Sequence, residues 1–257
     1  MSESQLMEAI RLHAPGGAAS LAVDRIGIPQ PGRDEALVRV HAAAITRDEL
    51  DWPMDRLPAI PSYELSGTIA ALGTNVTDVA VGDAVWALTA FDRDGVAAEY
   101  AVVPAELLVA KPKRLSHVEA AAVPLPALSA WQGLFDHGSL RAGERLLVTG
   151  ARGGVGHLAV QLARLHGAEV VDELPADLVF DTKGSDVRGN RTVTVAAELP
   201  GATYFVVEPN RAQLEEIARL DLDVAIDSVF PLEEAGAAFG RSMASGKQGK
   251  VVLRVRD

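Results

Sequence analysis

The sequence predicts an α/β protein with a mainly β first part and an α/β second part. Short apolar segments separated by proline and glycine fill the first hundred residues, which is typical of strands joined by tight turns. A helix start follows at Ser116, and residues 146–171 combine an apolar segment, a glycine turn and a helical pattern. With 257 residues, the chain can bury one large core or two modest ones.

Short strands are expected throughout the first part. Proline and glycine bracket each of them, as in a small barrel or a sandwich. The clearest segments are residues 36–42, 65–73, 82–88 and 98–103. The β character ends at Ser116-His-Val-Glu119, which reads as a capping box. In this motif the serine hydroxyl and the glutamate carboxylate satisfy free N–H groups at the start of a helix.

The stretch from Leu146 to Val171 predicts a strand, a tight turn and a helix. Such a turn lets backbone N–H groups at the helix N-terminus approach a pyrophosphate, and the helix dipole favours the anion. The residues that we assign to cofactor binding here are Gly150, Gly153, Gly154, Val155 and Gly156. The pattern is not the strict G-x-G-x-x-G, so a turn that merely packs a helix on a sheet is the alternative. The flanking strand and helix favour nucleotide binding.

The composition excludes several classes of function. A net charge of −11 disfavours a nucleic-acid partner. Because the chain has no cysteine, disulfides, thiolate zinc sites and cysteine nucleophiles are excluded. The most apolar segment, residues 120–131, is broken by Pro124 and Pro126. We therefore expect no membrane partner and a cytoplasmic location.

Several motifs occur together in the order of a known superfamily. They are Ala44-Ile-Thr-Arg-Asp-Glu-Leu, Pro61-Ser-Tyr-Glu-Leu-Ser-Gly, Val81-Gly-Asp-Ala-Val, Ala98-Glu-Tyr, and residues 122–131 and 148–156. Through them the chain resembles the medium-chain dehydrogenase/reductase superfamily, and within it the zinc-free quinone oxidoreductase branch. The resemblance implies a GroES-like β-barrel substrate domain at residues 1–122, completed by residues 222–257. It also implies a Rossmann-type parallel-sheet domain at residues 123–221, with hydride transfer from NADPH in the cleft between the two.

The resemblance also bears on zinc. Thr46 and Tyr63 stand where the alcohol dehydrogenases of the superfamily hold a metal-binding cysteine and histidine. Without any cysteine, neither the catalytic nor the structural zinc site of those enzymes can form. The six histidines are scattered singly, and we interpret them as surface or packing residues. We expect no metal site.

The parallel-sheet part is shorter than the family pattern. Only residues 172–176 separate the second strand of this part from the next apolar segment, residues 177–182. A parallel crossover takes roughly a dozen or more residues, usually with a helix. A helix cannot fit here, so either a taut connection of about 20 Å joins the strands or one segment is not a parallel strand.

The chain is shortened a second time. Only residues 183–190 precede a strand at residues 191–195, and the family carries a helix in place of this short segment. These losses remove the wall that holds adenine and the residues that hold the 2′-phosphate of NADPH in relatives. The remaining tail follows the family pattern, with a helix capped by Asn210 and Gln213. Its other expected elements are a strand at residues 224–230, a helix at about 232–244 and a closing strand from Lys250.

Asp172 lies 22 positions after Gly150 in the sequence. That separation is near the roughly 20 residues at which an acidic residue binds the adenosine ribose of NAD. One interpretation is therefore a preference for NADH. The other is a solvated loop charge, which we favour because the pocket around that ribose is missing.

The resemblance places four candidate catalytic residues near the cleft. Thr46 stands near the nicotinamide and Ser129 near the nicotinamide ribose, and both hydroxyls suit an enone or quinone oxygen. Asp48 and Tyr63 are candidate general acids. Asp48 and Tyr63 each have a structural alternative, as a helix cap and as a packing residue. Their neighbour Glu64 is also expected near the cleft, and its alternative is an ion pair with an arginine such as Arg47. The aromatic residues proposed as a substrate lining, with core packing as the default, are Trp52, Trp86, Phe91, Trp131, Tyr204 and Phe205.

Two functions stay open from the sequence. The first is a reductase that transfers a hydride from NADPH or NADH to an enone or quinone, such as a polyketide-like small molecule. The second is a cofactor-independent, non-redox enzyme on the same scaffold, such as a cyclase, isomerase or lyase. Nothing positive supports a third possibility, a binding protein without catalysis. A homodimer through the edge strand, residues 191–195 or 204–207, is also expected.

Overall fold

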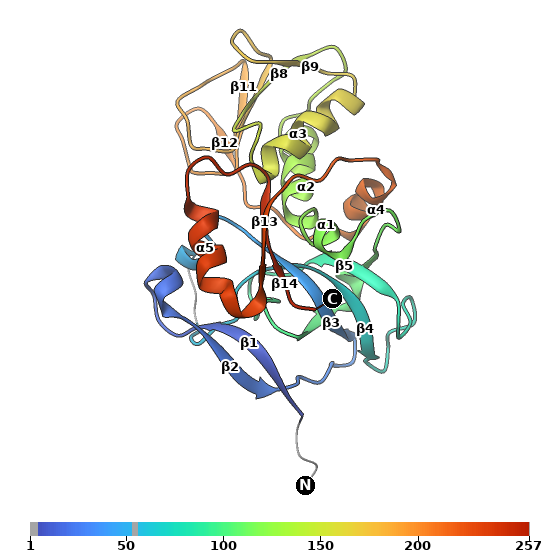
Figure 1. Cartoon of the computed structure of the whole chain (residues 1–257). Helices are drawn as coiled ribbons and strands as arrows, with labels where there is room; N and C mark the ends of the chain where they lie inside the picture. The colour runs from blue at the N-terminus through green and yellow to red at the C-terminus, as the bar shows by residue number, and fades with distance from the viewer. Residues whose placement is uncertain (1–4, 53–55, 257) are drawn as a thin grey trace.

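The computed structural model describes residues 5–52 and 56–256. Two main sheets form the molecule, and short helices lie between them (Figure 1). A seven-stranded sheet occupies the lower part of the view and a five-stranded parallel sheet the upper part. The predicted fold, a GroES-like barrel part with a shortened Rossmann-type part, is confirmed. No helix in the described ranges is long and apolar enough to cross a membrane.

The lower sheet contains the strands predicted for the first part of the chain. They are β3 (Glu35–Ile45), β4 (Glu64–Leu72), β5 (Ala84–Leu88), β6 (Tyr100–Pro104) and β7 (Val109–Ala110). β3 is the longest of them and pairs with β4, β6 and the C-terminal strand. Val38, Val40 and Leu65 are fully buried in its interior, because alternate side chains of each strand face the core.

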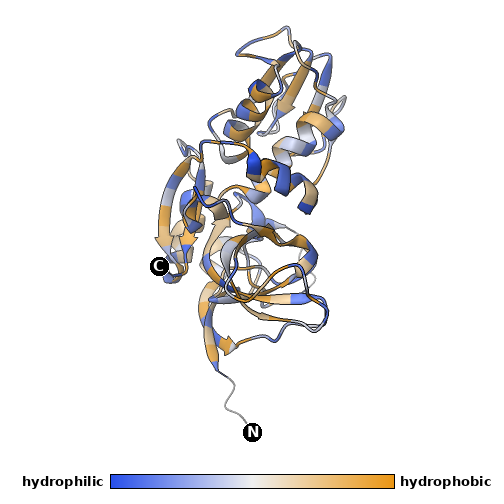
Figure 2. Cartoon of the chain, turned by 90° about the vertical axis from the view of Figure 1, so that its right-hand side faces the viewer, coloured by the Kyte–Doolittle hydropathy of each residue, from blue (hydrophilic) through white to orange (hydrophobic). Residues whose placement is uncertain are grey.

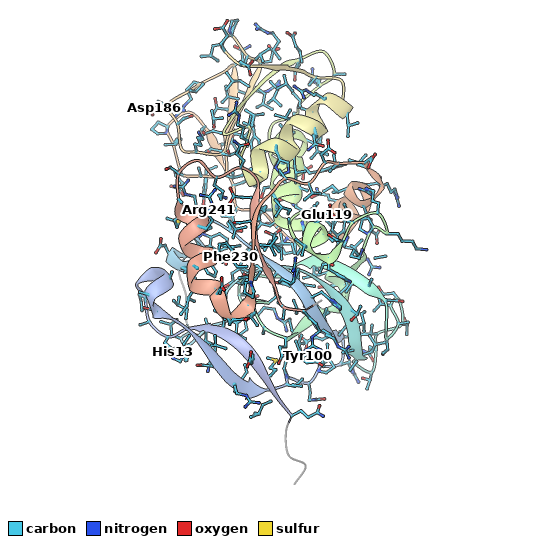
Figure 3. All side chains as sticks on the ribbon, in the orientation of Figure 1. His13, Tyr100, Glu119, Asp186, Phe230 and Arg241 are labelled. Carbon is cyan, nitrogen blue, oxygen red and sulfur yellow. The ribbon has the colours of Figure 1, made fainter. Side chains whose placement is uncertain are left out.

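The C-terminal segment completes this sheet. β13 (Ile226–Pro231) and β14 (Lys250–Arg254) run parallel, and β14 pairs antiparallel with β3. The expected helix between them is present as a 3-10 turn (Leu232–Glu234) followed by α5 (Ala235–Met243). Arg241 lies on α5 beside β13, where its guanidinium binds the Asp227 carboxylate at 2.6 Å (Figure 3).

A separate hairpin lies at the base of the barrel (Figure 1). β1 (Leu6–Leu12) and β2 (Leu21–Gly27) pair antiparallel, joined by a 3-10 turn (Gly17–Ser20). Single bridges from Ala9 to Ala98 and from Leu12 to Ala59 attach the hairpin to the rest of the chain.

Three short helical segments connect the two sheets. The capping box is confirmed, because Ser116 Oγ accepts a bond from Glu119 N and Glu119 Oε2 accepts one from Ser116 N. The segments are α1 (His117–Ala121), α2 (Pro124–Trp131) and a π-helical turn (Gln132–His137). Gly133 in the π-helical turn is needed for close packing, since a Cβ there would lie 2.3 Å from the ring of Phe180.

The upper sheet contains the predicted strand, glycine turn and helix. All its strands are parallel, in the order β12-β11-β10-β8-β9, and in Figure 2 the apolar colour follows them. Its elements are β8 (Arg145–Thr149), α3 (Gly154–Leu165), β9 (Glu169–Val171), β10 (Leu178–Asp181), β11 (Arg191–Thr194) and β12 (Thr203–Tyr204). The chain then forms α4 (Arg211–Arg219), capped by Asn210 Oδ1 on Gln213 N as expected.

The short connections resolve the question that the sequence left open. Residues 172–176 carry the chain from β9 past β8 to β10, without a helix, and both strands stay parallel in the sheet. Residues 182–190 likewise join β10 to β11 without a helix. On this face of the sheet Ala176 and Val187, from the two loops, pack against Leu147 and Val179. Loops therefore cover apolar surface that helices cover in the family pattern.

One of the two expected edge strands is wrong. β11 lies inside the sheet between β10 and β12, so residues 191–195 have partners on both sides. The edge on this side of the sheet is β12, whose two residues, Thr203 and Tyr204, are both exposed, and β9 is the other edge.

Candidate functional site

The glycine turn between β8 and α3 forms one side of the candidate site. Gly150 has a φ of 74°, and a Cβ on Gly156 would lie 2.2 Å from Gly150 O, so both positions require glycine. Gly153 is the N-cap of α3 and no side chain caps the helix. The side chain of Val155 packs on the core. No side chain therefore satisfies the N–H groups of the first turn of α3, although Gly249 and Lys250 lie against Gly154.

The C-terminal segment is fastened to this turn. Gly249 N donates to Arg152 O at 3.0 Å, and Gly153 and Gly249 form a parallel bridge. His157 on α3 contacts Gly153 O through Nδ1 at 2.9 Å, while its Nε2 accepts from Ala225 N at 3.2 Å. These partners place the proton on Nδ1 and make His157 a packing residue, as the sequence suggested.

A buried ion pair lies beside the turn. Lys250 Nζ and Glu64 Oε1 are 2.5 Å apart, and their side chains are 5% and 0% exposed. Glu64 Oε2 also accepts from Leu125 N at the start of α2, at 2.9 Å. A Cβ on Gly154 would lie 2.7 Å from Lys250 Cδ, so the lysine runs directly along the start of α3. Burial raises the pKa of Glu64, and the Lys250 ammonium opposes that rise.

The expected pairing of Glu64 with Arg47 is wrong. Arg47 is exposed and its guanidinium donates to Met243 O at 3.4 Å. The actual partner, Lys250, is 186 positions away from Glu64 and reaches it because β14 and β4 both pair with β3. Nearness in sequence favoured Arg47, but the register of three strands decides the contact.

Thr46 connects this ion pair to a second buried acid. Lys250 Nζ donates to Thr46 Oγ1 at 3.5 Å, and Thr46 N donates to Glu49 Oε2 at 3.0 Å. Glu49 Oε1 accepts from Ser62 N at 3.0 Å. Burial raises the pKa of Glu49 to about 8, and the charge of Glu64 adds to the rise, while the Thr46 N–H and Lys250 oppose it. Thr46 itself is half-buried, and it is the member of the cluster nearest to solvent.

Sequence reasoning missed Glu49 and Lys250. A signal for Glu49 was present, since Thr46-x-x-Glu49 matches the spacing of a capping box and its carboxylate makes the corresponding bond to Thr46 N. The neighbouring Asp48 occupies the N-cap of the short 3-10 turn (Glu49–Asp51), but its side chain makes no cap bond. The helix-cap interpretation of the Asp48 side chain is therefore wrong.

The other three candidate catalytic residues lie in different surroundings. Asp48 is exposed and lines a hollow of about 140 Å³ together with Arg47, Phe239 and Met243. Tyr63 is buried and its ring centroid lies 5.9 Å from that of Trp52. Burial, and then the charge of Glu49, raises the pKa of Tyr63. Ser129 is buried, and its hydroxyl donates to Leu125 O at 2.8 Å within α2.

The aromatic residues do not form one common lining. Trp52, Tyr63 and Phe91 make one cluster with centroid distances of 5.1–5.9 Å. Trp86 is fully buried in the core, and Tyr204 lies on the exposed edge strand. Core packing, the default interpretation, therefore holds for Trp86.

Asp172 lies in the loop that replaces the missing elements. Both Asp172 and Glu173 are exposed directly after β9. This position fits a solvated loop charge, and the ribose contact stays a prediction.

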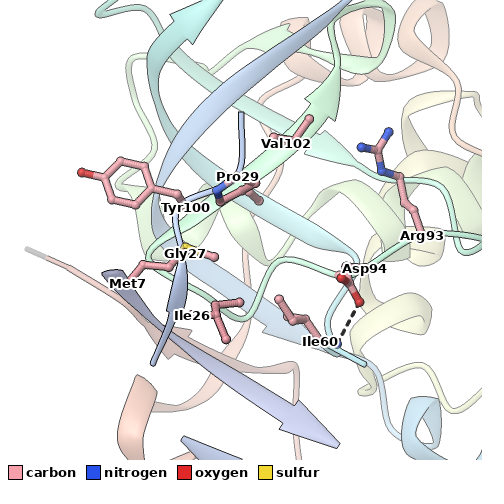
Figure 4. A pocket seen from close by; sticks show the side chains of 11 residues that line it. Met7, Ile26, Gly27, Pro29, Ile60, Arg93, Asp94, Tyr100 and Val102 are labelled. Carbon is pink, nitrogen blue, oxygen red and sulfur yellow. Dashed lines mark hydrogen bonds between the residues drawn. The ribbon is translucent and has the colours of Figure 1, made fainter. Parts of the chain in front are cut away.

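A larger hollow of about 250 Å³ lies in the barrel part (Figure 4). Met7, Ile26 and Ile60 form its apolar side, and Asp94 accepts a bond from Ile60 N at 3.2 Å. None of the predicted site residues lines it. In the part of the chain that the structure describes, no group of three or more His, Cys, Asp or Glu side chains is placed to hold a metal ion.

Comparisons with known proteins agree with the architecture. Residues 32–113 match the family model of the alcohol dehydrogenase GroES-like domain. The chloroplastic quinone-oxidoreductase homolog of Spinacia oleracea is 32% identical over 253 residues, which cover 84% of this chain and 75% of that protein. The quinone oxidoreductase of Homo sapiens is 32% identical over 264 residues, covering 98% of this chain and 77% of that protein.

The solved structure of the quinone oxidoreductase from Coxiella burnetii has the same fold. It is 24% identical, covers 98% of this chain and 100% of that chain, and gives a TM-score of 0.88. The relatives are oxidoreductases, which supports a reductase at the level of the family. The chain therefore belongs to the medium-chain dehydrogenase/reductase superfamily, among relatives named quinone oxidoreductases.

Proposed function

We propose that this protein is a zinc-independent reductase that uses NADH or NADPH to reduce an enone or a quinone. The observation that carries the proposal is the contact between an uncapped glycine turn and a buried polar cluster. Lys250 runs along Gly154 of the turn and reaches Thr46 at 3.5 Å. An anion site and a hydrogen-bond donor for a substrate oxygen thus lie next to each other. In this arrangement residues 123–221 hold the nucleotide, and residues 1–122 with 222–257 hold the small-molecule substrate.

The chain fits one end of a nicotinamide dinucleotide better than the other. The first turn of α3, which no side chain caps, would bind its pyrophosphate through the N–H groups of Val155 and Gly156. The adenosine end would meet the short loop at residues 172–176 instead of a full helix and strand. Because Asp172 and Glu173 are acidic and exposed there, they would repel a 2′-phosphate, so we expect NADH to bind more tightly than NADPH.

The chain's own contribution to the reaction is at the substrate oxygen. The bound dinucleotide supplies the hydride. Thr46 is half-buried at the cluster, and its hydroxyl would donate to the oxygen where negative charge develops. Tyr63 is less suited to this role because its raised pKa makes the phenol a weaker acid and its ring is buried in an aromatic cluster. Ser129 would act only after giving up its bond to Leu125 O.

The proposal is tested by calorimetric titration of the purified protein with NADH and, separately, with NADPH. The matched variants are Gly153→Asp and Gly153→Asn. Gly153 has φ −76° and ψ 173°, which any residue can adopt, and both new side chains are good N-caps. The aspartate adds a negative charge where the pyrophosphate would bind, and the asparagine does not.

We expect micromolar binding to the wild type and at least about tenfold weaker binding to Gly153→Asp than to Gly153→Asn. The two variants should be equally stable, because the Cβ of each makes the same 3.2 Å approach to Gly150 O. Equal affinities in the two variants would show that the phosphates do not bind at this turn. No heat with either dinucleotide at millimolar concentration, and no nucleotide bound to the purified protein, would remove the reductase proposal.

A further inference from the structure

Three neighbouring strands bring Lys250, Thr46 and Glu64 to one end of the barrel sheet. Val251 of β14 pairs with Ile45 of β3, so Lys250 comes opposite Thr46, the residue after β3 ends. Ala44 of β3 pairs with Glu64, the first residue of β4. The relative positions of the three side chains are therefore fixed by backbone pairing of a sheet, which holds them more firmly than a loop would.

The hydrogen bonds within this group have a direction. The Lys250 ammonium can only donate; it forms an ion pair with Glu64 Oε1 at 2.5 Å and donates a hydrogen bond to Thr46 Oγ1 at 3.5 Å. Because Thr46 Oγ1 accepts from the lysine, its own O–H is free to donate elsewhere. The main-chain N–H of Thr46 is held by Glu49 Oε2 at 3.0 Å, which fixes the residue from the other side.

The three side chains of this group also differ in their exposure to solvent. The Lys250 and Glu64 side chains are 5% and 0% exposed, whereas Thr46 is half-buried. Of the three side chains, Thr46 is therefore the one that a substrate would meet first. Because the ion pair is buried, the local dielectric constant is low, and a cation next to a hydroxyl polarises its O–H bond more strongly than it would in water.

We propose that Lys250 is a positioning residue that holds and polarises the Thr46 hydroxyl, so that a proton passes from Lys250 through Thr46 to the substrate oxygen. The inference rests on the proposed reductase function. The hydride brings two electrons to the acceptor and leaves an enolate or quinol oxyanion. The Thr46 O–H bond then breaks as the substrate O–H bond forms, and Lys250 Nζ gives its proton to Thr46 Oγ1. Solvent returns a proton to Lys250 after the product leaves.

The test is a double-mutant cycle on NADH- or NADPH-dependent reduction of 1,4-naphthoquinone. The variants are Thr46→Val, Lys250→Met and the two combined, with an enzyme-free blank. Since Lys250→Met leaves Glu64 as an unpaired buried charge, a second form combines Lys250→Met with Glu64→Gln and removes both charges. The matched control is Lys113→Met, which changes an exposed lysine on the loop before α1. Circular dichroism and cofactor affinity are measured for every form.

We expect Thr46→Val to lower kcat by about 100-fold and Lys250→Met by about 10- to 100-fold. Because both residues act in one proton path, the combined variant should be no more than about threefold slower than Thr46→Val alone. The Kd for the cofactor should change less than about threefold in the folded variants, and Lys113→Met should behave as the wild type.

Three results would overturn the inference while leaving the reductase in place. They are multiplying effects in the combined variant, an unchanged kcat in Thr46→Val, and a loss of cofactor affinity in the Lys250 variants that accounts for their slower turnover. If the wild type itself shows no dinucleotide-dependent turnover, the proposed function fails and the inference fails with it.

Discussion

Each of the two sheets has a buried carboxyl group beside it, and the surroundings of the two acids are opposite. Asp181 ends β10, and burial works to raise its pKa, but bonds from Thr149, Lys183 and Ser185 outweigh burial and lower the pKa. Glu49 lies beside the barrel sheet, and there burial prevails and raises the pKa to about 8. One acid is therefore held as a carboxylate at neutral pH, and the other keeps its proton.

The difference shows what each sheet does. Asp181 Oδ1 accepts from Lys183 N at 3.2 Å and Oδ2 accepts from Ser185 N at 3.0 Å, so the acid fastens the loop that stands in place of a helix. Its two oxygens accept bonds from five donors, and the residue is fully buried. The barrel-side cluster instead combines two acids, one ammonium and a half-buried hydroxyl. We conclude that the shortened sheet uses its buried charge for architecture, whereas the barrel-side charges serve the reaction only under the proposed function.

The largest effect is expected from removing Asp181. Asp181→Ala leaves the hydroxyls of Thr149 and Thr194 and two loop N–H groups without their acceptor. Bonds to a charged acceptor are the stronger class, so we expect the free energy of unfolding to fall by about 3–5 kcal/mol in urea titrations. Asp186→Ala, an exposed acid in the same loop (Figure 3), is the control and should change it by less than about 0.5 kcal/mol. A loss below about 1 kcal/mol in Asp181→Ala would contradict the anchoring role.

Glu49 should make the free energy of unfolding decrease as the pH rises, which is the opposite of the effect of an acid with a lowered pKa. The folded protein keeps the Glu49 proton up to about pH 8, whereas an ordinary glutamate releases it near its reference pKa of 4.5. Its contribution to stability is therefore complete below pH 4.5 and decreases as the pH rises toward 8, by up to about 1.4 kcal/mol per pH unit.

The measurement is the difference in free energy of unfolding between the wild type and Glu49→Gln at several pH values. This difference should fall steadily from pH 5 to pH 8, because glutamine does not titrate. Glu106→Gln, at an exposed glutamate, should give a difference that does not vary with pH. A flat difference for Glu49→Gln would show that the buried acid is ionised throughout.

Gly133 lies at the closely packed junction of the two halves, and Gly240 lies in the outer helix of the barrel. Substitution by alanine should have opposite effects on stability at the two positions. In Gly133→Ala the new Cβ would lie 2.3 Å from the buried ring of Phe180, and we expect a loss of about 1–3 kcal/mol from overpacking. Gly240 in α5 has no atom within 4 Å of a Cβ. Gly240→Ala should therefore stabilise the protein by up to about 1 kcal/mol, because alanine is the better helix former. Thermal unfolding of both variants measures the contrast, which fails if both shifts have the same sign.

The sequence predicted the parts of the fold that depend on local chemistry. The capping box at Ser116, the Asn210 cap and the glycine turn at Gly150 are all signalled within a few residues, and all are present. The route of the chain from β9 to β10 was left open, because a five-residue loop permits more than one path and the packing of the sheet decides between them.

The buried cluster was less accessible from the sequence. Its central contact joins Glu64 to Lys250 through the register of three strands, and no local pattern records that register. Thr46 was singled out by resemblance, and the structure adds the groups around it. Glu49 carried a local signal in its spacing from Thr46, yet its burial depends on the fold of the whole barrel.

The smallest effect is expected at the two sheet edges, where the same substitution can be compared. β12 ends the parallel sheet and β13 ends the barrel sheet, with Tyr204 39% and Val229 37% exposed. We expect a homodimer through β12, because an exposed strand edge offers unpaired N–H and C=O groups to a second copy. β12 is only two residues long, so the backbone bonds are few and the dimer should be weak.

A lysine on an edge strand opposes such pairing. Tyr204→Lys should therefore raise the dimer dissociation constant by about tenfold, equivalent to about 1.4 kcal/mol, whereas Val229→Lys should leave it unchanged. Light scattering after size-exclusion chromatography over a range of concentrations measures both. A monomer at all concentrations would show that the edge stays unpaired. A dimer lost only in Val229→Lys would place the interface on the barrel sheet, and the shortened sheet would then contribute nothing to assembly.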